Sequence, residues 1–276
     1  MCSRTGEGSS ARRTDLIIWS VTKDVAVNPW LEVPDTPPFV VPVDERYVEA
    51  FNASDCRRPE HEIDTTLLPE PWLGRHDAPV VMLTANPGFD PSDVAFHARP
   101  DFAQANRANL TTPGGEPNYL LDQRFSDAPG AGWWRRRAFA QLLRDGVSEE
   151  ALRNRVLVVE FHGYHSRSWT PLPVTLPSQW YGFSLVEQAV RRGALVIVAR
   201  PARLWLVAVP ELGQHPERVF TLRSTQNPAI SPKNLGSQAG YEAVVAAQDG
   251  RSRIEADRGR GQRVRRWLEP VASPDR

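Results

Sequence analysis

Two asparagine–proline segments carry the residue types best suited to chemistry on a bound ligand. Asn86-Pro87-Gly88 follows one apolar run, and Asn227-Pro228 follows another, 227 − 86 = 141 residues further along. An asparagine amide both donates and accepts hydrogen bonds, and a glycine lets the backbone approach a ligand closely. Both segments are also typical of ordinary turns, so their type alone leaves a purely structural interpretation open.

Four short apolar runs predict the strands that position these segments. They cover residues 79–84, 155–159, 194–199 and 218–222. Continuous apolar runs of this length are typical of buried parallel strands. Helical patterns at 132–144, 183–192, 201–209 and 232–247 alternate with them. This alternation predicts a three-layer α/β/α fold, with a central, mostly parallel sheet and helices on both faces.

Polar side chains follow the ends of all four predicted strands. Asn86, Glu160 and Arg200 follow the first three, and the segment 224–227 follows the fourth. The carboxyl ends of parallel strands meet at one edge of the sheet, where open α/β proteins bind their ligands. We therefore expect these side chains to line one cleft.

The composition argues against several classes of protein. The 33 basic and 33 acidic side chains give a net charge of zero, which does not favour a nucleic-acid binder, although arginines cluster at 135–137 and in the last 26 residues. The two cysteines form no spaced cluster, which speaks against a disulfide framework, a zinc ribbon or an iron–sulfur site. The polar start lacks the apolar core of a signal peptide, and no apolar run has the length of a membrane span, so a cytoplasmic location without membrane contact is predicted.

The chain divides into four predicted segments. Residues 1–13 are expected to be disordered, and residues 14–74 to form an irregular, proline-rich lead-in packed on the core. Residues 75–248 form the α/β domain, and residues 249–276 a basic tail. The polar stretch 89–130 inside the domain is expected to be functional or disordered, because long structureless stretches are uncommon in compact domains.

At this point the motifs resemble those of a known family. Ala85-Asn86-Pro87-Gly88 after a buried strand is similar to the first motif of the uracil-DNA glycosylase superfamily, nearest to its mismatch-specific and single-strand-selective branches. Residues 224–231 lie where the second motif would be, and the order of strands and helices over residues 75–248 also matches. The chain is similar, too, to a set of uncharacterised bacterial proteins that share patterns found here at 164–167, 176–179 and 231–234.

The resemblance implies a monomeric enzyme that hydrolyses the N-glycosidic bond of a damaged or modified base in single- or double-stranded DNA, without metal or cofactor. Asn86 would position the attacking water, and Asn227 would donate a hydrogen bond to the leaving base. The other residues expected to contact substrate would approach it by backbone, stack on the base, line the cleft or hold phosphates; they are Pro87, Gly88, Phe89, Glu160, His165, Ser224, Ser231 and Lys233.

Two positions depart from the family pattern. Ala85 stands where the family usually has glycine, and Glu160 stands where an asparagine typically reads the uracil edge. An ionised carboxylate accepts hydrogen bonds but cannot donate one, so an ionised Glu160 would favour a base with an amino group over uracil. Pairing of Glu160 with Arg200 or Arg167 is an equal alternative.

Three other interpretations remain open at this stage. His162 and His165 are spaced like metal ligands but lack a clear third partner, so no metal is predicted. A nucleic-acid or nucleotide-binding module that has lost its catalysis is the main alternative function. A hydrolase of small nucleosides is a third.

Overall fold

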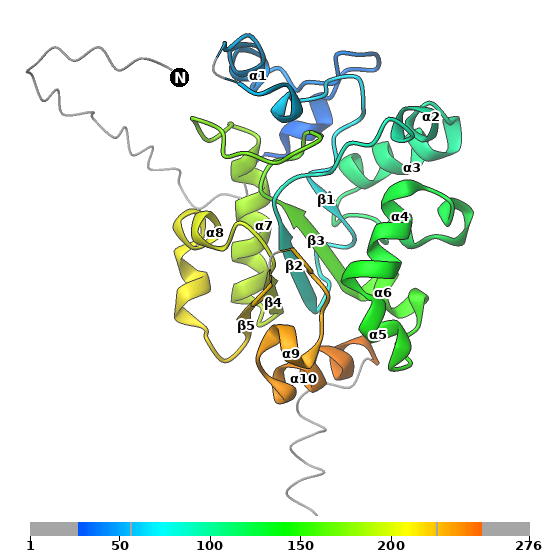
Figure 1. The fold of residues 1–276 in the computed structure, drawn as a ribbon, viewed down its shortest axis with the longest axis vertical. Helices are drawn as coiled ribbons and strands as arrows, with labels where there is room; N and C mark the ends of the chain where they lie inside the picture. Colours follow the sequence, from blue (N-terminus) through cyan, green and yellow to red (C-terminus); the bar gives the residue numbers. More distant parts are fainter. Residues whose placement is uncertain (1–26, 56, 225, 250–276) are drawn as a thin grey trace, which may run out of the picture.

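The computed structural model describes residues 27–55, 57–224 and 226–249 (Figure 1). Among these residues a sheet of five strands, in the order β1-β3-β2-β4-β5, forms the centre. Four strands run parallel to one another: β2 (Val80–Thr84), β3 (Val156–Glu160), β4 (Leu195–Val198) and β5 (Val219–Thr221). The edge strand β1 (Trp72–Leu73) pairs antiparallel with β3. The α/β class and the mostly parallel central sheet are therefore confirmed.

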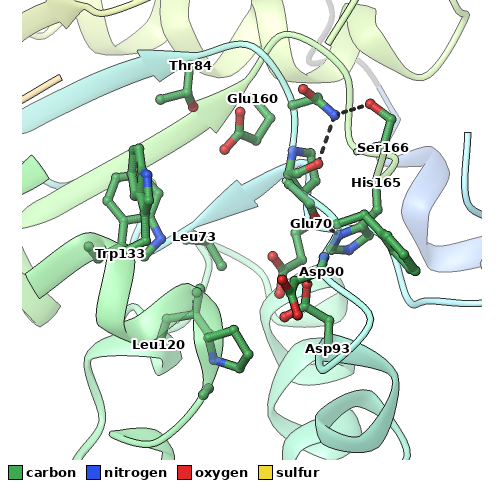
Figure 2. Close-up of a pocket in the computed structure, with 18 of the residues that line it drawn as sticks. Glu70, Leu73, Thr84, Asp90, Asp93, Leu120, Trp133, Glu160, His165 and Ser166 are labelled. Atoms are coloured by element: carbon green, nitrogen blue, oxygen red, sulfur yellow. Dashed lines mark hydrogen bonds between the residues drawn. The ribbon is translucent and has the colours of Figure 1, made fainter. Parts of the chain in front are cut away.

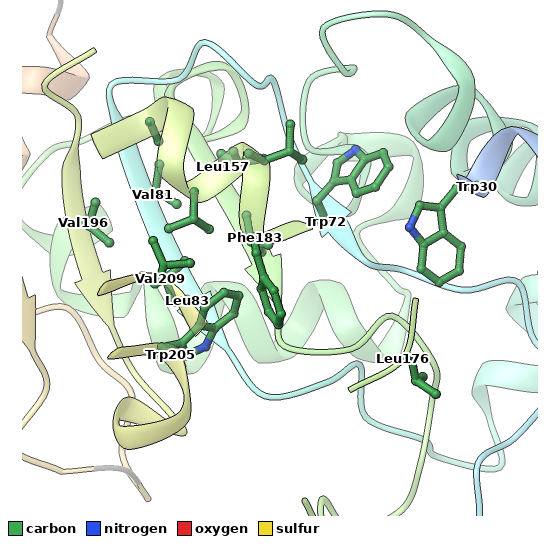
Figure 3. Close-up of a cluster of buried hydrophobic side chains, with 14 of the residues drawn as sticks. Trp30, Trp72, Val81, Leu83, Leu157, Leu176, Phe183, Val196, Trp205 and Val209 are labelled. Carbon is green, nitrogen blue, oxygen red and sulfur yellow. The ribbon is translucent and has the colours of Figure 1, made fainter. Parts of the chain in front are cut away.

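Helices cover both faces of the sheet. Alternate side chains of a strand point to opposite faces, so Val81 and Leu83 enter one hydrophobic core while Val80 and Met82 enter the other. The first core is covered by α1 (Glu45–Asn52), α7 (Gln179–Arg191) and α8 (Ala202–Ala208), and Figure 3 shows part of it. The second is covered by α4 (Pro129–Trp133), α5 (Ala140–Arg144), α6 (Glu149–Arg155), α9 (Pro232–Leu235) and α10 (Gln238–Gln248).

The polar stretch after β2 is folded rather than structureless. It contains α2 (Asp93–His97) and α3 (Pro100–Thr111), followed by two short 3-10 turns. Helix α3 buries Phe102 in one core and Leu110 in the other. Asn106 and Asn109 are also buried on this helix.

The predicted helix at 132–144 is broken into three pieces. Between α4 and α5 lies a π-helical segment, Trp134–Ala138, in which the Phe139 amide bonds to the Trp134 carbonyl five residues back. The wider turn lets the rings of Trp134 and Phe139 stack at a centroid distance of 5.4 Å inside the core. The predicted helix at 232–247 is also divided, because Gly236 takes a left-handed conformation (φ 67°) that ends α9.

The lead-in contributes to the sheet. Trp72 and Leu73 form β1, and Trp30, Val41 and Val48 are buried in the first core. The expected disordered start and nearly all of the basic tail lie outside the described residues. Within the described ranges, no helix combines the length and the apolar character needed to cross a lipid bilayer.

Candidate functional site

A cavity of about 490 Å³ opens where the parallel strands end (Figure 2). Thr84 of β2, Glu160 of β3 and Arg200, just after β4, all line it. The strands β3 and β4 lie on opposite sides of β2, so the strand order reverses at β2. Open α/β folds usually bind their ligands in the crevice at such a switch point. The volume lies in the range of small-molecule sites.

The side-chain amide of Asn86 is held in one orientation on the wall of this cavity. Its Nδ2 donates to the Pro87 carbonyl at 2.8 Å, to Ser166 Oγ at 2.9 Å and more distantly to the Tyr164 carbonyl at 3.4 Å. Its Oδ1 accepts no hydrogen bond from the described residues, although Asn86 is only 9% exposed. The free acceptor is therefore available to a ligand or a water in the cavity.

The loop that orients Asn86 is anchored from behind. The hydroxyl of Tyr164 donates to Asp44 Oδ2 at 2.9 Å and accepts from the Val41 amide at 3.3 Å. Gln179 donates to the Phe161 carbonyl at 2.6 Å. Motif residues Tyr164 and Gln179 thus fix the backbone that carries Ser166, rather than facing the cavity themselves.

Glu160 is a buried carboxyl without a cationic partner. It is 7% exposed, it forms no ion pair with a described residue, and its Oε2 is buried without a hydrogen-bond partner. Burial raises the pKa of Glu160 from its ordinary 4.5 to about 8; the neighbouring Thr84 side chain and the charge of Arg200 oppose the rise, and the nearby Glu70 adds to it. The expected alternative of a pair with Arg200 or Arg167 is not formed. At neutral pH the group is mainly the neutral acid, which can both donate and accept.

A second buried carboxyl, Glu70, lies across the cavity from Glu160. It accepts a hydrogen bond from the hydroxyl of Tyr119. Burial raises the pKa of Glu70, while His165 and the Tyr119 hydroxyl oppose that rise. The cavity therefore contains two buried carboxyls, and burial raises the pKa of both.

Glu70, His97 and His165 lie close enough together to suggest a metal site. His165 does not fit this role: its Nδ1 lies 2.7 Å from the Gly88 carbonyl and its Nε2 lies 3.0 Å from the Leu68 carbonyl. A metal ligand needs a free nitrogen lone pair, and both nitrogens of this ring face acceptors. Burial lowers the pKa of His97 to about 3, so that ring is neutral. We assign no metal to this group, and His162 lies outside it.

The mouth of the cavity combines arginines with aromatic rings. Arg136, Arg167 and Arg200 line it, are exposed, and form no ion pair with any described residue. The Arg167 guanidinium lies over the Phe89 ring at 5.4 Å. Trp133, 37% exposed, also lines the cavity, edge-on to Trp134 at a centroid distance of 4.7 Å. Flat apolar rings and unpaired cations at one opening suit a ligand with an aromatic ring and an anionic group.

The second asparagine–proline segment reaches the cavity through Pro228 only. Asn227 is exposed, and its backbone amide donates to Ser224 Oγ at 3.1 Å. Ser231 caps α9 by accepting from the Asn234 amide, and Lys233 is exposed on that helix. Asn227, Ser224, Ser231 and Lys233 do not line the cavity, whereas all the other expected site residues do: Asn86, Pro87, Gly88, Phe89, Glu160 and His165.

Asn234 explains why this segment keeps its shape. Its Nδ2 donates to the carbonyls of Asn227 (2.8 Å) and Ala229 (2.9 Å), and its Oδ1 accepts from the Ser224 amide at 2.8 Å. The Ser231–Asn234 motif therefore holds Pro228 against the cavity.

Several cavity residues could not be identified from the sequence. Glu70 lies between two prolines in the lead-in and carries no local signal. Arg136 has the pattern of a solvated helix face, and His97 belongs to a helix that the sequence did not predict.

Comparison of the chain with protein-family models, with curated proteins and with solved structures finds no match.

Proposed function

We propose that the protein hydrolyses the N-glycosidic bond of a damaged or modified base in DNA, with Asn86 positioning the attacking water. The observation that supports this most is the fixed amide of Asn86: three acceptors hold its Nδ2, and its Oδ1 is left to accept from a water at the cavity wall. An oriented acceptor lowers the barrier by placing the water before the reaction.

The cavity suits a base turned out of the DNA stack. A flipped base is typically held by aromatic stacking and by hydrogen bonds to its edge. Trp133 and Phe89 supply rings at the opening, and Glu160 supplies a paired donor and acceptor inside. The neutral acid removes the repulsion that an ionised Glu160 would exert on a carbonyl oxygen of the base.

The arginines at the mouth would hold the DNA backbone. Arg136, Arg167 and Arg200 lie around the opening through which a nucleotide must enter, and free guanidinium groups bind phosphate well. They provide a local basic edge in a protein of zero net charge. The phosphate contacts expected of Ser224, Ser231 and Lys233, and the hydrogen bond expected from Asn227, remain predictions that rest on the family resemblance.

The test is base release from end-labelled oligonucleotides, single- and double-stranded, that carry one uracil, hypoxanthine, xanthine or modified cytosine. Abasic sites are detected by alkaline strand cleavage. We expect cleavage with the wild type and at least a hundredfold less with Asn86→Ala, with Arg191→Ala as a control distant from the cavity lining. Tight binding without any cleavage would instead support the non-catalytic module, and activity on free nucleosides alone would support the nucleoside hydrolase.

A further inference from the structure

Around Asn86, several side-chain donors of the cavity lining are already used by the protein. The Asn86 Nδ2 is already used by three acceptors, and both ring nitrogens of His165 face carbonyls. The Thr84 hydroxyl donates to the Val159 carbonyl at 3.2 Å. The acceptors that remain for a ligand include the Asn86 Oδ1 and the carboxyls of Glu70 and Glu160, and Trp169 adds an Nε1–H without a partner among the described residues. An amino group on a bound base would satisfy the acceptors beside Asn86 and Glu160.

The acid form of Glu160 places a donor next to these acceptors. No described cation lies within ion-pair distance of it, and its Oε2 has no protein partner. Burial accordingly raises its pKa to about 8, so a proton is carried at neutral pH. The group presents an O–H beside a C=O, which matches a ring nitrogen next to an exocyclic amino group.

Building on the proposed function, we propose that Glu160 is the proton donor for a cytosine-type base, recognised by its ring nitrogen N3 and its 4-amino group. The O–H of Glu160 pairs with N3, and its C=O accepts from the amino group. Uracil already carries a hydrogen on N3, so it can pair with a neutral carboxyl but cannot take the Glu160 proton at that nitrogen, and this distinguishes the two substrate classes.

The reaction balances without a cofactor. The Glu160 proton moves to N3, the bond between the sugar C1′ and N1 breaks, and its electron pair stays on N1, so the base leaves uncharged. Water held by Asn86 adds to C1′ and releases a proton to solvent, and the Glu160 carboxylate takes up a proton from solvent once the base has left, which restores the acid. A cytosine-type base is a poor leaving group unless it is protonated, so this transfer governs the rate.

The decisive experiment compares the release of cytosine, 5-methylcytosine, uracil and hypoxanthine from matched oligonucleotides between pH 6 and pH 9. We expect the wild type to release an amino-bearing cytosine, with a rate that falls as the pH rises past about 8. Glu160→Gln keeps the shape but has no transferable proton, so its rate should fall at least a hundredfold. Glu242→Gln, an exposed change on α10, should match the wild type. Thermal unfolding shows whether each variant folds.

The outcomes separate the two proposals. Release of only uracil or hypoxanthine, or a Glu160→Gln rate equal to that of the wild type, would overturn the role of Glu160 and leave the proposed function standing. A wild-type rate that does not change between pH 6 and pH 9 would also overturn it, even if Glu160→Gln failed to fold. No release of any base by the wild type would overturn the proposed function itself.

Discussion

The side-chain amide of Asn86 donates a hydrogen bond to the hydroxyl of Ser166, 80 residues further along the chain and 2.9 Å away. The same hydroxyl of Ser166 donates in turn to the Ser168 carbonyl at 3.2 Å. The backbone supports the same contact, since Gly88 and Ser166 form an isolated parallel bridge. The loop after β3 therefore sets the orientation of a residue that follows β2.

Ser166→Ala should lower kcat for base release about tenfold and leave KM nearly unchanged, because the amide of Asn86 loses one of its fixed partners while the cavity keeps its shape. Asn86→Ala should lower kcat at least a hundredfold. Steady-state kinetics of both variants check this order. Equal rates for Ser166→Ala and the wild type would show that this hydrogen bond does not orient the amide.

The stability of the fold should depend on pH through Glu160. The folded pKa of Glu160, about 8, lies above its ordinary 4.5, so between these values the unfolded chain releases a proton that the folded chain keeps. This contribution is complete below pH 4.5 and is lost as the pH rises to 8. Glu160→Gln should therefore gain stability relative to the wild type over that range, by on the order of a few kcal/mol. Urea unfolding of both proteins at pH 5, 7 and 9 measures the difference, and a constant difference would contradict it.

The three arginines at the cavity mouth should contribute to DNA affinity through phosphate contacts. Replacing Arg136, Arg167 or Arg200 by alanine should weaken binding to any sequence and reduce the slope of log K against log salt by about 0.7 for single strands or 0.9 for duplex. Arg191→Ala on α7, whose guanidinium lies 3.5 Å from Glu187, is the matched control. Fluorescence anisotropy from 50 to 300 mM salt tests this, and unchanged slopes in all three variants would argue against phosphate contacts.

Tyr119→Phe should destabilise the fold by about 1–3 kcal/mol, because it leaves the buried Glu70 carboxyl without its hydroxyl donor. Tyr241→Phe removes a hydroxyl that bonds to the exposed Asp145 and should cost about 1 kcal/mol or less. Chemical denaturation at pH 7 compares the two. A smaller effect at Tyr119 than at Tyr241 would mean that Glu70 is satisfied in another way.

Gly74→Ala should be strongly destabilising. Gly74 has a φ of +111°, and an added Cβ would lie 2.3 Å from the Val156 carbonyl oxygen, a backbone atom that cannot move aside. Gly146→Ala measures the cost of the backbone conformation alone, without a clash, because Gly146 has a φ of +90° and open space around it. We expect about 1 kcal/mol at Gly146 and at least about 3 kcal/mol at Gly74, measured by urea unfolding. Similar losses at both sites would mean that the clash is relieved.

The sequence predicted the parts of the fold that carry strong local patterns. The four apolar runs became β2 to β5 with nearly the predicted bounds. The first three are buried throughout, as continuous aliphatic segments in a parallel sheet usually are, whereas β5 at the edge is partly exposed. It also predicted that Asn86, Glu160 and Arg200 would meet, since parallel strands bring their carboxyl ends to one edge.

The remaining features depend on tertiary contacts that no local pattern encodes. The two-residue strand β1 pairs with β3, and the π-helical turn at Trp134 accompanies the stacking of two rings in the core. The protonation of Glu160 depends on burial and on missing partners, neither of which is visible in the residue type.

The antiparallel direction of β1 makes the site inseparable from the lead-in. A strand that runs against its neighbour begins at the edge where the parallel strands finish, so β1 delivers Glu70 to the cavity, and the Pro71 carbonyl accepts from the Glu160 amide at 3.0 Å. A fragment starting at residue 75 would keep four strands yet lose one acid of the cavity, the backbone partner of the other, and the cover over the outer edge of β3. Removing residues 1–74 would thus remove part of the cavity wall as well as the edge strand.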